Sequence, residues 1–321
     1  MEKELIIIGA GPIGLACGIA AQEAGLDYLI LEKGTLVNSL FNYPLLMTFF
    51  STAGKLEIGG VPFTCTRPKP GRQEALEYYR KVAECKQLAI KLFTRVERLE
   101  KLADGRFYIQ SSGGDYYAWN VVVATGFYDI AYPLNVPGEH LPKVRHYYKE
   151  PHEFAFQKVV VAGAQNSAVD AALETYRKGA DVTMVVRGTQ IGRRVKYWVR
   201  PDIINRIEEG SIKAHFEASL LEIREKSVLI QTPGGVKEID NDFVLAMTGY
   251  RPDKTLLKSV GVTFSKDGKE QPFYDEATMQ TNIQGLYLAG VICGGVETHK
   301  WFIENSRAHA RLIIDAIGKG K

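Results

Sequence analysis

The run Leu5-Ile6-Ile7-Ile8-Gly9-Ala10-Gly11-Pro12-Ile13-Gly14 decides the fold of this chain. Its first four residues are apolar and mostly β-branched, which predicts a strand buried on both faces of a parallel sheet. Gly9 then permits a tight turn, Gly11 lets the backbone approach a pyrophosphate, and Gly14 lets the next helix pack on the strand. That helix begins near Ile13 and directs its free N–H groups toward phosphates. The run therefore predicts a dinucleotide-binding βα unit.

A carboxylate completes this first unit. Gly25 fits the end of the helix, and residues 28–31 form the next apolar strand. Glu32 follows that strand, 23 residues after Gly9. A carboxylate at this place suits the free ribose hydroxyls of a dinucleotide such as FAD.

A second βα unit repeats the plan with the opposite charge. Residues 159–161 are a valine strand, residues 166–178 favour a helix, and residues 182–186 form the following strand. Arg187 lies 24 residues after Gly163, and a guanidinium there suits a ribose 2′-phosphate. The sequence therefore predicts two dinucleotides on one chain, FAD first and NADPH second.

The second turn departs from the glycine pattern. Gln165 occupies the second glycine position and Ala168, an ordinary substitute, the third. Either the pyrophosphate lies further out or the Gln165 amide contacts it. The basic residues after the strand either hold a 2′-phosphate, each contact contributing roughly 1.5–3 kcal/mol, or form a solvated surface loop. They are Arg187, Arg193, Arg194 and Lys196.

Bulk composition narrows the class of protein. The chain has 321 residues, 45% hydrophobic and 24% charged, which is typical of a soluble globular protein of two domains. A net charge of +3 favours neither nucleic acid nor a membrane surface as a partner. No apolar stretch approaches spanning length, and the first residues run straight into a strand, so we expect a cytoplasmic protein. The spacing of Cys17, Cys65, Cys85 and Cys293 predicts neither a metal site nor a disulfide framework.

The remaining pattern indicates two domains, one inserted into the other. Residues 35–72 are irregular, 73–89 favour a helix, and 90–120 alternate as a meander with turns at 104–105 and 113–114. A strand ends in Ala124-Thr125-Gly126, a late strand spans 285–289, and a long helix is expected over 298–317. We predict an α/β fold of two Rossmann-like three-layer domains. The FAD domain is discontinuous, residues 1–124 and 250–321, and the NADPH domain comprises residues 125–249.

The motif order resembles the low-molecular-weight thioredoxin-reductase-like flavoproteins over essentially the whole chain. After the first fingerprint come Ala-Thr-Gly (124–126), Asn-Ser-Ala (166–168), Thr-Gly-Tyr-Arg-Pro-Asp (248–253) and Ala-Gly (289–290). Narrower stretches resemble the YpdA family of bacillithiol-disulfide (bacilliredoxin) reductases, namely residues 42–44, 47–52, 56–63 and 196–202.

This resemblance implies FAD and NADPH as cofactors, a low-molecular-weight disulfide or a small redox protein as electron acceptor, and a homodimer. Together with the fingerprints it gives two sets of cofactor-binding residues. The FAD set is Gly9, Gly11, Pro12, Gly14, Glu32, Lys33, Asn42, Thr48, Thr125, Gly126, Gly290 and Val291. The NADPH set is Gly163, Gln165, Asn166, Ser167, Ala168, Arg187, Arg193, Thr248 and Gly249.

Three departures from the family pattern limit what the resemblance implies. Thioredoxin reductases place a Cys-x-x-Cys before the second fingerprint, where this chain reads His146-Tyr147-Tyr148-Lys149. Members of the bacillithiol-linked group often carry a cysteine where this chain has Ile13. An aspartate usually follows the late Ala-Gly, and here the residue is Val291.

The flavin itself is expected to carry the chemistry, with two weak candidates for side-chain participation. Cys293 could approach the flavin, whereas Cys17 is expected to be a small buried residue. The final helix, opening near Thr298, could aim its positive end at the reduced flavin, with Lys300 adding a full charge. The alternative is that Trp301 and Phe302 anchor the core and Lys300 is solvated.

Four functions compete at this stage. The first is an NADPH-dependent flavoprotein reductase of a small disulfide. The second is a ferredoxin or flavodoxin NADP reductase, which shares the architecture and also lacks the dithiol. A flavin monooxygenase is less favoured, because its Phe-x-Gly-x-x-x-His marker is not matched when its histidine is aligned on His146. The last is a non-catalytic flavin-dependent sensor.

Overall fold

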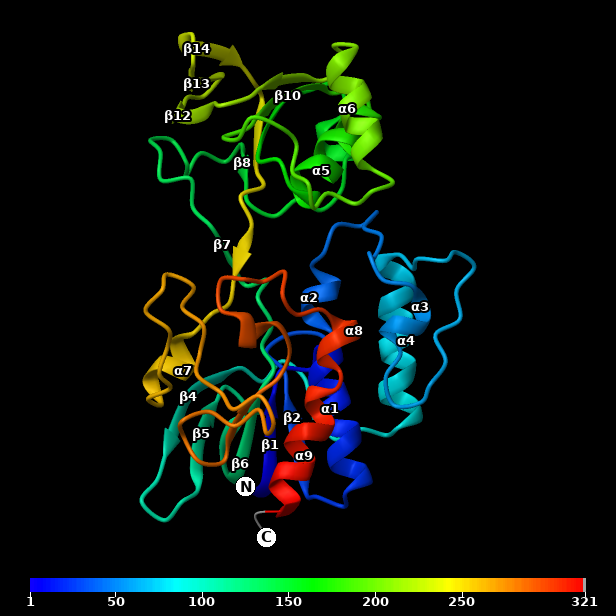
Figure 1. Cartoon of the computed structure of the whole chain (residues 1–321), viewed down its shortest axis with the longest axis vertical. Coiled ribbons are helices and arrows are strands. Elements are labelled where there is room, and N and C mark those ends of the chain that lie inside the picture. Colours follow the sequence, from blue (N-terminus) through cyan, green and yellow to red (C-terminus); the bar gives the residue numbers. More distant parts are fainter. Residues whose placement is uncertain (320–321) are drawn as a thin grey trace. The chain divides into compact units, whose positions relative to one another are not determined.

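The computed structural model describes residues 1–319, which fold into two compact units (Figure 1). The first unit holds residues 1–42, 48–130 and 250–319, and the second holds residues 43–47 and 131–249. The chain passes from the first unit to the second between Ile130 and Ala131, whereas the predicted domain boundary lies between residues 124 and 125. The chain passes there because strand β7 (Ile130–Ala131) pairs with strand β16 (Tyr250–Arg251) where the chain returns.

The short segment 43–47 also departs from the predicted division. The Leu45 N–H donates to the Lys149 carbonyl at 2.7 Å, which joins this segment to the second unit. Its neighbours Asn42 and Thr48 belong to the first unit.

One seven-stranded sheet forms the centre of the first unit, in the order β3-β2-β1-β6-β5-β4 with β17 also on β6. Its parallel strands are β1 (Glu2–Ile8), β2 (Tyr28–Leu31), β3 (Ile90–Lys91), β6 (Gly114–Val123) and β17 (Leu286–Leu288). The antiparallel strands β4 (Val96–Lys101) and β5 (Phe107–Ser111) continue it. The predicted meander and the predicted strand before Ala124 are therefore joined in the single strand β6. Its first half pairs with β5 and its last three residues pair with β17.

Helix α1 (Pro12–Glu23) packs against β1, β2 and α9 (His309–Lys319) in this unit. Helix α4 (Arg72–Cys85) contacts α2 (Asn38–Phe41), and the one-turn helix α3 (Ala53–Leu56) contacts α8 (Ile303–Ser306). The remaining pieces are α7 (Thr255–Ser259), beside β4, and the 3-10 turn η2 (Gly290–Gly294).

The expectation of one helix over 298–317 is wrong at its start. Residues 298–300 form a turn, and α8 and α9 are separated at residues 307–308. The Asn305 side chain accepts the Phe302 N–H at 2.7 Å, so it caps a helix that begins only at Ile303.

The second unit has three layers, as predicted. Its parallel sheet has the order β11-β10-β9-β15-β8, and helices α5 and α6 pack with one face while the antiparallel strands β12–β14 cover the other. Val159 and Val161 of β9 face the helices, whereas Val160 faces the antiparallel strands, which is the period-two alternation of a strand. The bounds of the strands are β8 Val144–Arg145, β9 Lys158–Ala162, β10 Asp181–Val185, β11 Lys213–His215, β12 Ser219–Ile223, β13 Ser227–Thr232, β14 Gly235–Asp240 and β15 Phe243–Ala246. The helices are η1 His152–Phe154, α5 Asn166–Tyr176 and α6 Arg200–Glu208.

Equivalent backbone hydrogen bonds align the residues that follow the second strand of each nucleotide turn. The Glu32 N–H donates to the Lys91 carbonyl at 3.0 Å, and the Val186 N–H donates to the His215 carbonyl at 2.9 Å. Two residues further on, Phe93 (φ +50°) and Glu217 (φ +51°) donate to the carbonyls of Gly34 and Gly188. This register makes Val186 the counterpart of Glu32.

Arg187 is consequently the counterpart of Lys33. The prediction that Arg187 stands in the place of Glu32 is therefore off by one position, which accounts for spacings of 23 and 24 residues.

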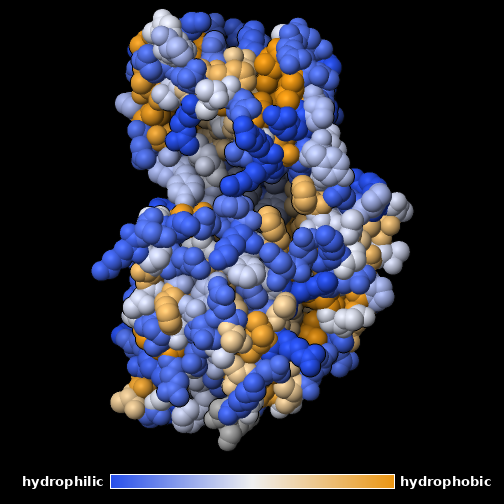
Figure 2. Space-filling model, in the orientation of Figure 1, coloured by the Kyte–Doolittle hydropathy of each residue, from blue (hydrophilic) through white to orange (hydrophobic). Residues whose placement is uncertain are grey.

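Polar and charged side chains cover most of the surface in the view of Figure 2. Among residues 1–319, no helix has both the length and the apolar character needed to span a bilayer.

Candidate functional site

The first glycine-rich turn requires its glycines for steric reasons. Gly9 has φ +109°, and a Cβ on it would lie 2.6 Å from the Ala124 carbonyl oxygen. A Cβ on Gly14 would lie 1.8 Å from the Gly9 carbonyl oxygen, so α1 packs directly on the turn. A Cβ on Gly11 would meet nothing within 4 Å, and Pro12 occupies the first turn of α1. The backbone at Gly11 thus faces open space at a helix N-terminus with no side-chain cap.

Glu32 is fixed beside this turn by two backbone donors. Its carboxylate accepts the Ala10 N–H at 2.8 Å and the Gly34 N–H at 2.9 Å, and the residue is 5% exposed. Burial raises the pKa of Glu32, while the two N–H groups and Lys33 act in the opposite direction. Glu32 lies beside the turn because it follows β2 directly.

Thr125 supplies a polar group that lacks a protein partner. Its Oγ1 is buried and makes no hydrogen bond within the described chain, although buried hydroxyls are nearly always paired. It follows Ala124, against which Gly9 packs, and precedes Gly126 (φ +75°). An unsatisfied hydroxyl beside an open turn fits a site whose ligand carries hydroxyl or phosphate groups.

The second turn has the same backbone with looser packing. Gly163 (φ +134°) lies so close to Met247 that an added Cβ would be 2.5 Å from the Met247 carbonyl oxygen. Ala168 takes the place of Gly14, since its methyl group would be 3.1 Å from that Cβ. Gln165 is exposed and its side-chain amide lies against Gly192, where a Cβ would be 2.5 Å from Oε1.

Asn166 ties the loop after β10 to the start of α5. Its Nδ2 donates to the Arg194 carbonyl at 3.1 Å, and its Oδ1 accepts the Lys196 N–H at 2.9 Å. Ser167, the next residue of α5, is exposed. The Asn166 side chain therefore positions the basic loop through both of its polar groups.

The predicted basic group divides into two kinds. Lys196 is buried and its Nζ lies 2.6 Å from Asp170 Oδ2, so it anchors the loop and is not available as a phosphate ligand. Arg187 and Arg193 are exposed, and Arg187 makes no ion pair with any residue from 1 to 319. No local pattern singles out Asp170, because it lies 26 positions before its partner.

Thr248 repeats Thr125 in the second unit but is satisfied. Its Oγ1 donates to the Tyr132 carbonyl at 2.7 Å, and Gly249 follows with φ +98°. The hydroxyl therefore holds the connector, which leaves it less free for a ligand than Thr125.

The other predicted residues of the first unit have mainly local roles. Lys33 forms an ion pair with Asp129 at 2.6 Å. Asn42 donates through Nδ2 to the Asn38 carbonyl at 2.8 Å, and Thr48 forms an isolated bridge with Gly71.

The late Ala-Gly turn contacts the first fingerprint. Gly290 (φ +83°) lies against Ile13, where an added Cβ would be 3.4 Å from the Ile13 Cβ. Its N–H donates to His309 Nδ1 at 3.2 Å, and Val291 is half-buried. Burial lowers the pKa of His309 to about 4, so this histidine is neutral at pH 7. Nothing in the sequence pattern singled out His309.

The two weak catalytic candidates have different surroundings in the first unit. Cys293 is fully buried with its Sγ 4.0 Å from His309 Nδ1, and burial raises the pKa of its thiol well above the ordinary value. Lys300 is exposed and lies over the Trp301 ring, 5.7 Å from its centroid. Lys300 also lies in a turn before α8, so the expected long helix does not carry it.

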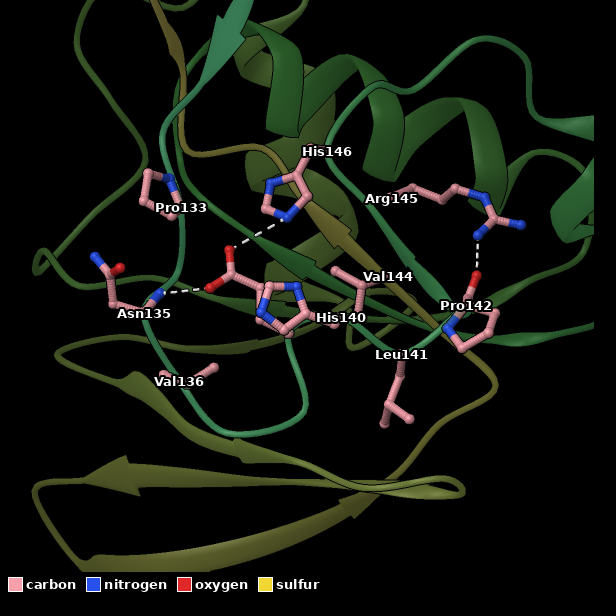
Figure 3. A pocket seen from close by; sticks show the side chains of 10 residues that line it. Pro133, Asn135, Val136, His140, Leu141, Pro142, Val144, Arg145 and His146 are labelled. Atoms are coloured by element: carbon pink, nitrogen blue, oxygen red, sulfur yellow. Dashed lines mark hydrogen bonds and ion pairs between the residues drawn. The ribbon is translucent and has the colours of Figure 1, made fainter.

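A pocket of about 620 Å³ opens on the connector of the second unit (Figure 3). Glu139 lies in it and accepts the N–H groups of Leu134 at 2.6 Å and Asn135 at 2.8 Å, while His146 Nε2 lies 3.3 Å from its Oε1. His146 opens the segment that stands in the dithiol slot of thioredoxin reductases, so a histidine–carboxylate pair begins that segment in this chain. Tyr148, two residues on, is buried and donates to Glu174 at 2.6 Å.

Comparison with known proteins identifies the family of this chain. The pyridine nucleotide-disulphide oxidoreductase family matches residues 6–290. The chain belongs to this family. It is 42% identical over 322 aligned residues to "Bacilliredoxin reductase Bdr" of Bacillus subtilis, covering 99% of this chain and 98% of that one.

Two solved structures are equally similar. "Bacillithiol Disulfide Reductase Bdr (YpdA)" from Staphylococcus aureus has 40% identity and a TM-score of 0.97, covering 100% of this chain and 99% of that one. The protein of the same name from Bacillus cereus has 42% identity and a TM-score of 0.97, with full coverage of both chains. The resemblance to the YpdA family is confirmed.

The chain is accordingly an oxidoreductase, and the cofactors of its family are FAD and NADPH. The described residues fit such cofactors. The first turn offers an open backbone, a fixed carboxylate and an unsatisfied hydroxyl. The second offers a like turn with exposed guanidinium groups after its second strand.

Proposed function

We propose that this chain passes electrons from NADPH through FAD to a low-molecular-weight disulfide, with bacillithiol disulfide, free or on a bacilliredoxin, as the candidate acceptor. The observation that carries the proposal is the end-to-end similarity, at 40–42% identity, to proteins named for that activity. Two complete nucleotide turns on the same chain support it.

The two turns would divide the cofactors between the units. We assign FAD to the first turn, where Glu32 would orient a ribose with free hydroxyls and Thr125 would bond to the flavin nucleotide. We assign NADPH to the second, where Arg187 and Arg193 would hold the 2′-phosphate. When bound, FAD supplies two-electron transfer between the nicotinamide and the acceptor.

The chain has no Cys-x-x-Cys pair of the kind that relays electrons in thioredoxin reductases. Cys17 and Cys293 are buried, and burial raises the pKa of the Cys17 thiol to about 12. Thiolates, and not thiols, are the nucleophiles of disulfide exchange. We therefore infer that the acceptor disulfide is reduced without a covalent intermediate on Cys17 or Cys293.

Anaerobic NADPH oxidation by the purified protein tests the proposal. The acceptors are bacillithiol disulfide with and without bacilliredoxin, thioredoxin, flavodoxin and ferredoxin, and a separate aerobic assay supplies oxygen. We expect a yellow protein that uses NADPH in preference to NADH and turns over fastest with the bacillithiol acceptors. Fastest turnover with flavodoxin or ferredoxin would instead support the carrier-reductase alternative, and oxygen consumption with a hydroxylated product would support a monooxygenase.

The proposal also includes a cellular location and an oligomeric state. A cytoplasmic location agrees with the finding that no helix of residues 1–319 could span a membrane, and fractionation of cells tests it. A homodimer is a prediction from the family resemblance, and sedimentation equilibrium of the holoprotein tests it.

A further inference from the structure

A cation follows the second strand of both nucleotide turns, at the same backbone position. Lys33 and Arg187 are counterparts, because the residues after them, Gly34 and Gly188, accept equivalent N–H groups at 3.1 and 2.9 Å. A basic residue at this position is therefore not enough to distinguish a site for a 2′-phosphate from a site for a free ribose.

The surroundings of the two cations differ. Lys33 Nζ lies 2.6 Å from Asp129 Oδ1, with side chains 34% and 23% exposed. It follows Glu32, whose carboxylate is fixed on two N–H groups. Lys33 also helps to lower the pKa of Asp253, which burial alone would raise, together with hydrogen bonds from Thr255 and the charge of Arg95. Among these carboxylates, Asp129 is the one in direct contact with the ammonium group of Lys33.

Arg187 has none of these neighbours among the described residues. Val186 precedes it, buried in the core and uncharged, and no carboxylate pairs with its guanidinium. The chain offers no counterpart of Asp129 in the second unit, because it leaves that unit directly after Gly249, whereas Asp129 lies three residues after Gly126.

We propose that Asp129 is a specificity-determining residue that cancels the charge of Lys33 and thereby keeps the first turn selective for a nucleotide with a free ribose 2′-hydroxyl. A 2′-phosphate carries between one and two negative charges and binds best where a cation is available to it. With Lys33 engaged by Asp129 and Glu32 beside it, such a phosphate meets net negative charge. The ion pair would prevent NADPH from competing for the turn that FAD occupies.

This inference rests on the proposed assignment of FAD to the first turn. Its test is the release of FAD from the holoprotein by competing nucleotides, followed by the fluorescence of free FAD. The measured quantity is the concentration ratio of 2′,5′-ADP to 5′-AMP that releases half of the FAD, since these two nucleotides differ only by the 2′-phosphate. In the unaltered protein 5′-AMP should be effective at the lower concentration.

Asp129→Asn should decrease this ratio roughly three- to fivefold, the range that a partly exposed charge pair supplies. Asp27→Asn is the matched control, because it removes a carboxylate of the same unit from an ion pair of 2.7 Å with Lys3, at the opposite end of β2. Adding Lys33→Met to Asp129→Asn should restore the original ratio, since Lys33 is the group that Asp129 restrains. Calorimetric affinity of the holoprotein for 2′,5′-ADP at the second turn should not change.

An unchanged ratio in Asp129→Asn, or an equal change in Asp27→Asn, would overturn the inference. The proposed function is tested separately, since a yellow protein that oxidises NADPH supports it whatever the ratio. A protein that takes up no FAD contradicts both.

Discussion

The two nucleotide turns share a backbone and differ in how tightly it is packed. In the first, α1 lies so close to the turn that a Cβ on Gly14 would be 1.8 Å from the Gly9 carbonyl oxygen. In the second, α5 leaves room for the methyl group of Ala168. The two turns therefore share a hydrogen-bond pattern but differ in the distance between helix and turn. The residue at the third glycine position differs accordingly, with glycine where the helix lies close and alanine where it lies further away.

The two turns differ more sharply in the charge that follows. Glu32 of the first is buried and fully engaged by backbone donors, and the adjacent cation is neutralised by Asp129. Val186 of the second is apolar, and the adjacent Arg187 is exposed. Two turns of similar backbone thus differ in charge through a few side chains directly after their second strands.

The largest effect is expected on stability, when the residue at the third glycine position of each turn is exchanged for that of the other. Gly14→Ala should destabilise the first unit by about 3 kcal/mol and lower its FAD content, because backbone must move to admit the methyl group. The reciprocal change Ala168→Gly should cost only about 1 kcal/mol, the helix-propensity difference. Thermal unfolding followed by flavin fluorescence and circular dichroism measures both. Equal losses in the two variants would show that the helix–turn distances are not different.

The next largest effect is expected on the stability of the first unit at acid pH, to which His309 contributes. The pKa of His309 is about 4 in the folded protein, against about 6.5 in an unfolded chain. Its contribution to stability is therefore fully present above pH 6.5 and is lost as pH falls from 6.5 toward 4, by up to about 3 kcal/mol. His309→Asn keeps an acceptor for the Gly290 N–H but does not titrate, so it should remove this part of the acid sensitivity. Unfolding midpoints measured from pH 7.5 to 4.5 would contradict this if the two proteins lost stability in parallel.

Reversing the unpaired charge should separate the nucleotide preferences. Arg187→Glu should raise the KM for NADPH roughly 10- to 100-fold, with little effect on the KM for NADH, because it replaces a charge-assisted contact with repulsion. Lys178→Glu reverses an exposed charge elsewhere in the same unit and serves as the control. Steady-state kinetics with both nucleotides measure the effect. An unaltered preference for NADPH would remove Arg187 from the proposed site.

A smaller effect is expected from the anchor of the basic loop. Lys196→Met breaks the ion pair with Asp170 and should loosen the loop that carries Arg193, raising the KM for NADPH roughly fivefold at unchanged kcat. The double variant with Asp170→Asn should recover part of that loss, since no unpaired carboxylate then remains. If kcat fell and KM stayed constant, the ion pair would have a role other than positioning the loop.

The smallest effect is expected for the cysteines. Cys293→Ala should retain turnover with NADPH within about twofold, because a buried, protonated thiol is not a nucleophile. The number of thiols that react with a thiol reagent after denaturation should be the same before and after reduction by NADPH. An increase of two thiols on reduction would reveal a disulfide that takes part in the reaction.

Much of the site was predictable because its chemistry is local. Gly9, Gly14 and Glu32 follow from one strand–turn–helix–strand pattern, and the structure places all three at the same turn. Strand β6 was predicted in two pieces, because residues 115–120 alternate in burial whereas 121–123 are uniformly buried. That change occurs where the partner strand changes from β5 to β17, and no local pattern contains this exchange.

Residues with distant partners were the ones that sequence alone misjudged. Lys196 reads as one more basic residue of a loop, and its ion pair with Asp170 of α5 is set by how helix and loop pack. The helix expected from Thr298 begins only at Ile303, where the Asn305 side chain caps its first turn. His309 lacks a sequence signal altogether, since its burial against Gly290 exists only once α9 packs beside η2.

The sequence by itself determined that two nucleotide turns exist, where each begins, and that their following charges differ, because a glycine turn between an apolar strand and a helix is specified by neighbouring residues. Only the tertiary structure decided that Arg187 corresponds to Lys33 and that Lys33 is neutralised while Arg187 is not. Those facts depend on hydrogen bonds between adjacent strands and on side chains brought together from distant parts of the chain. Neither kind of contact can be predicted from a residue's neighbours in the sequence.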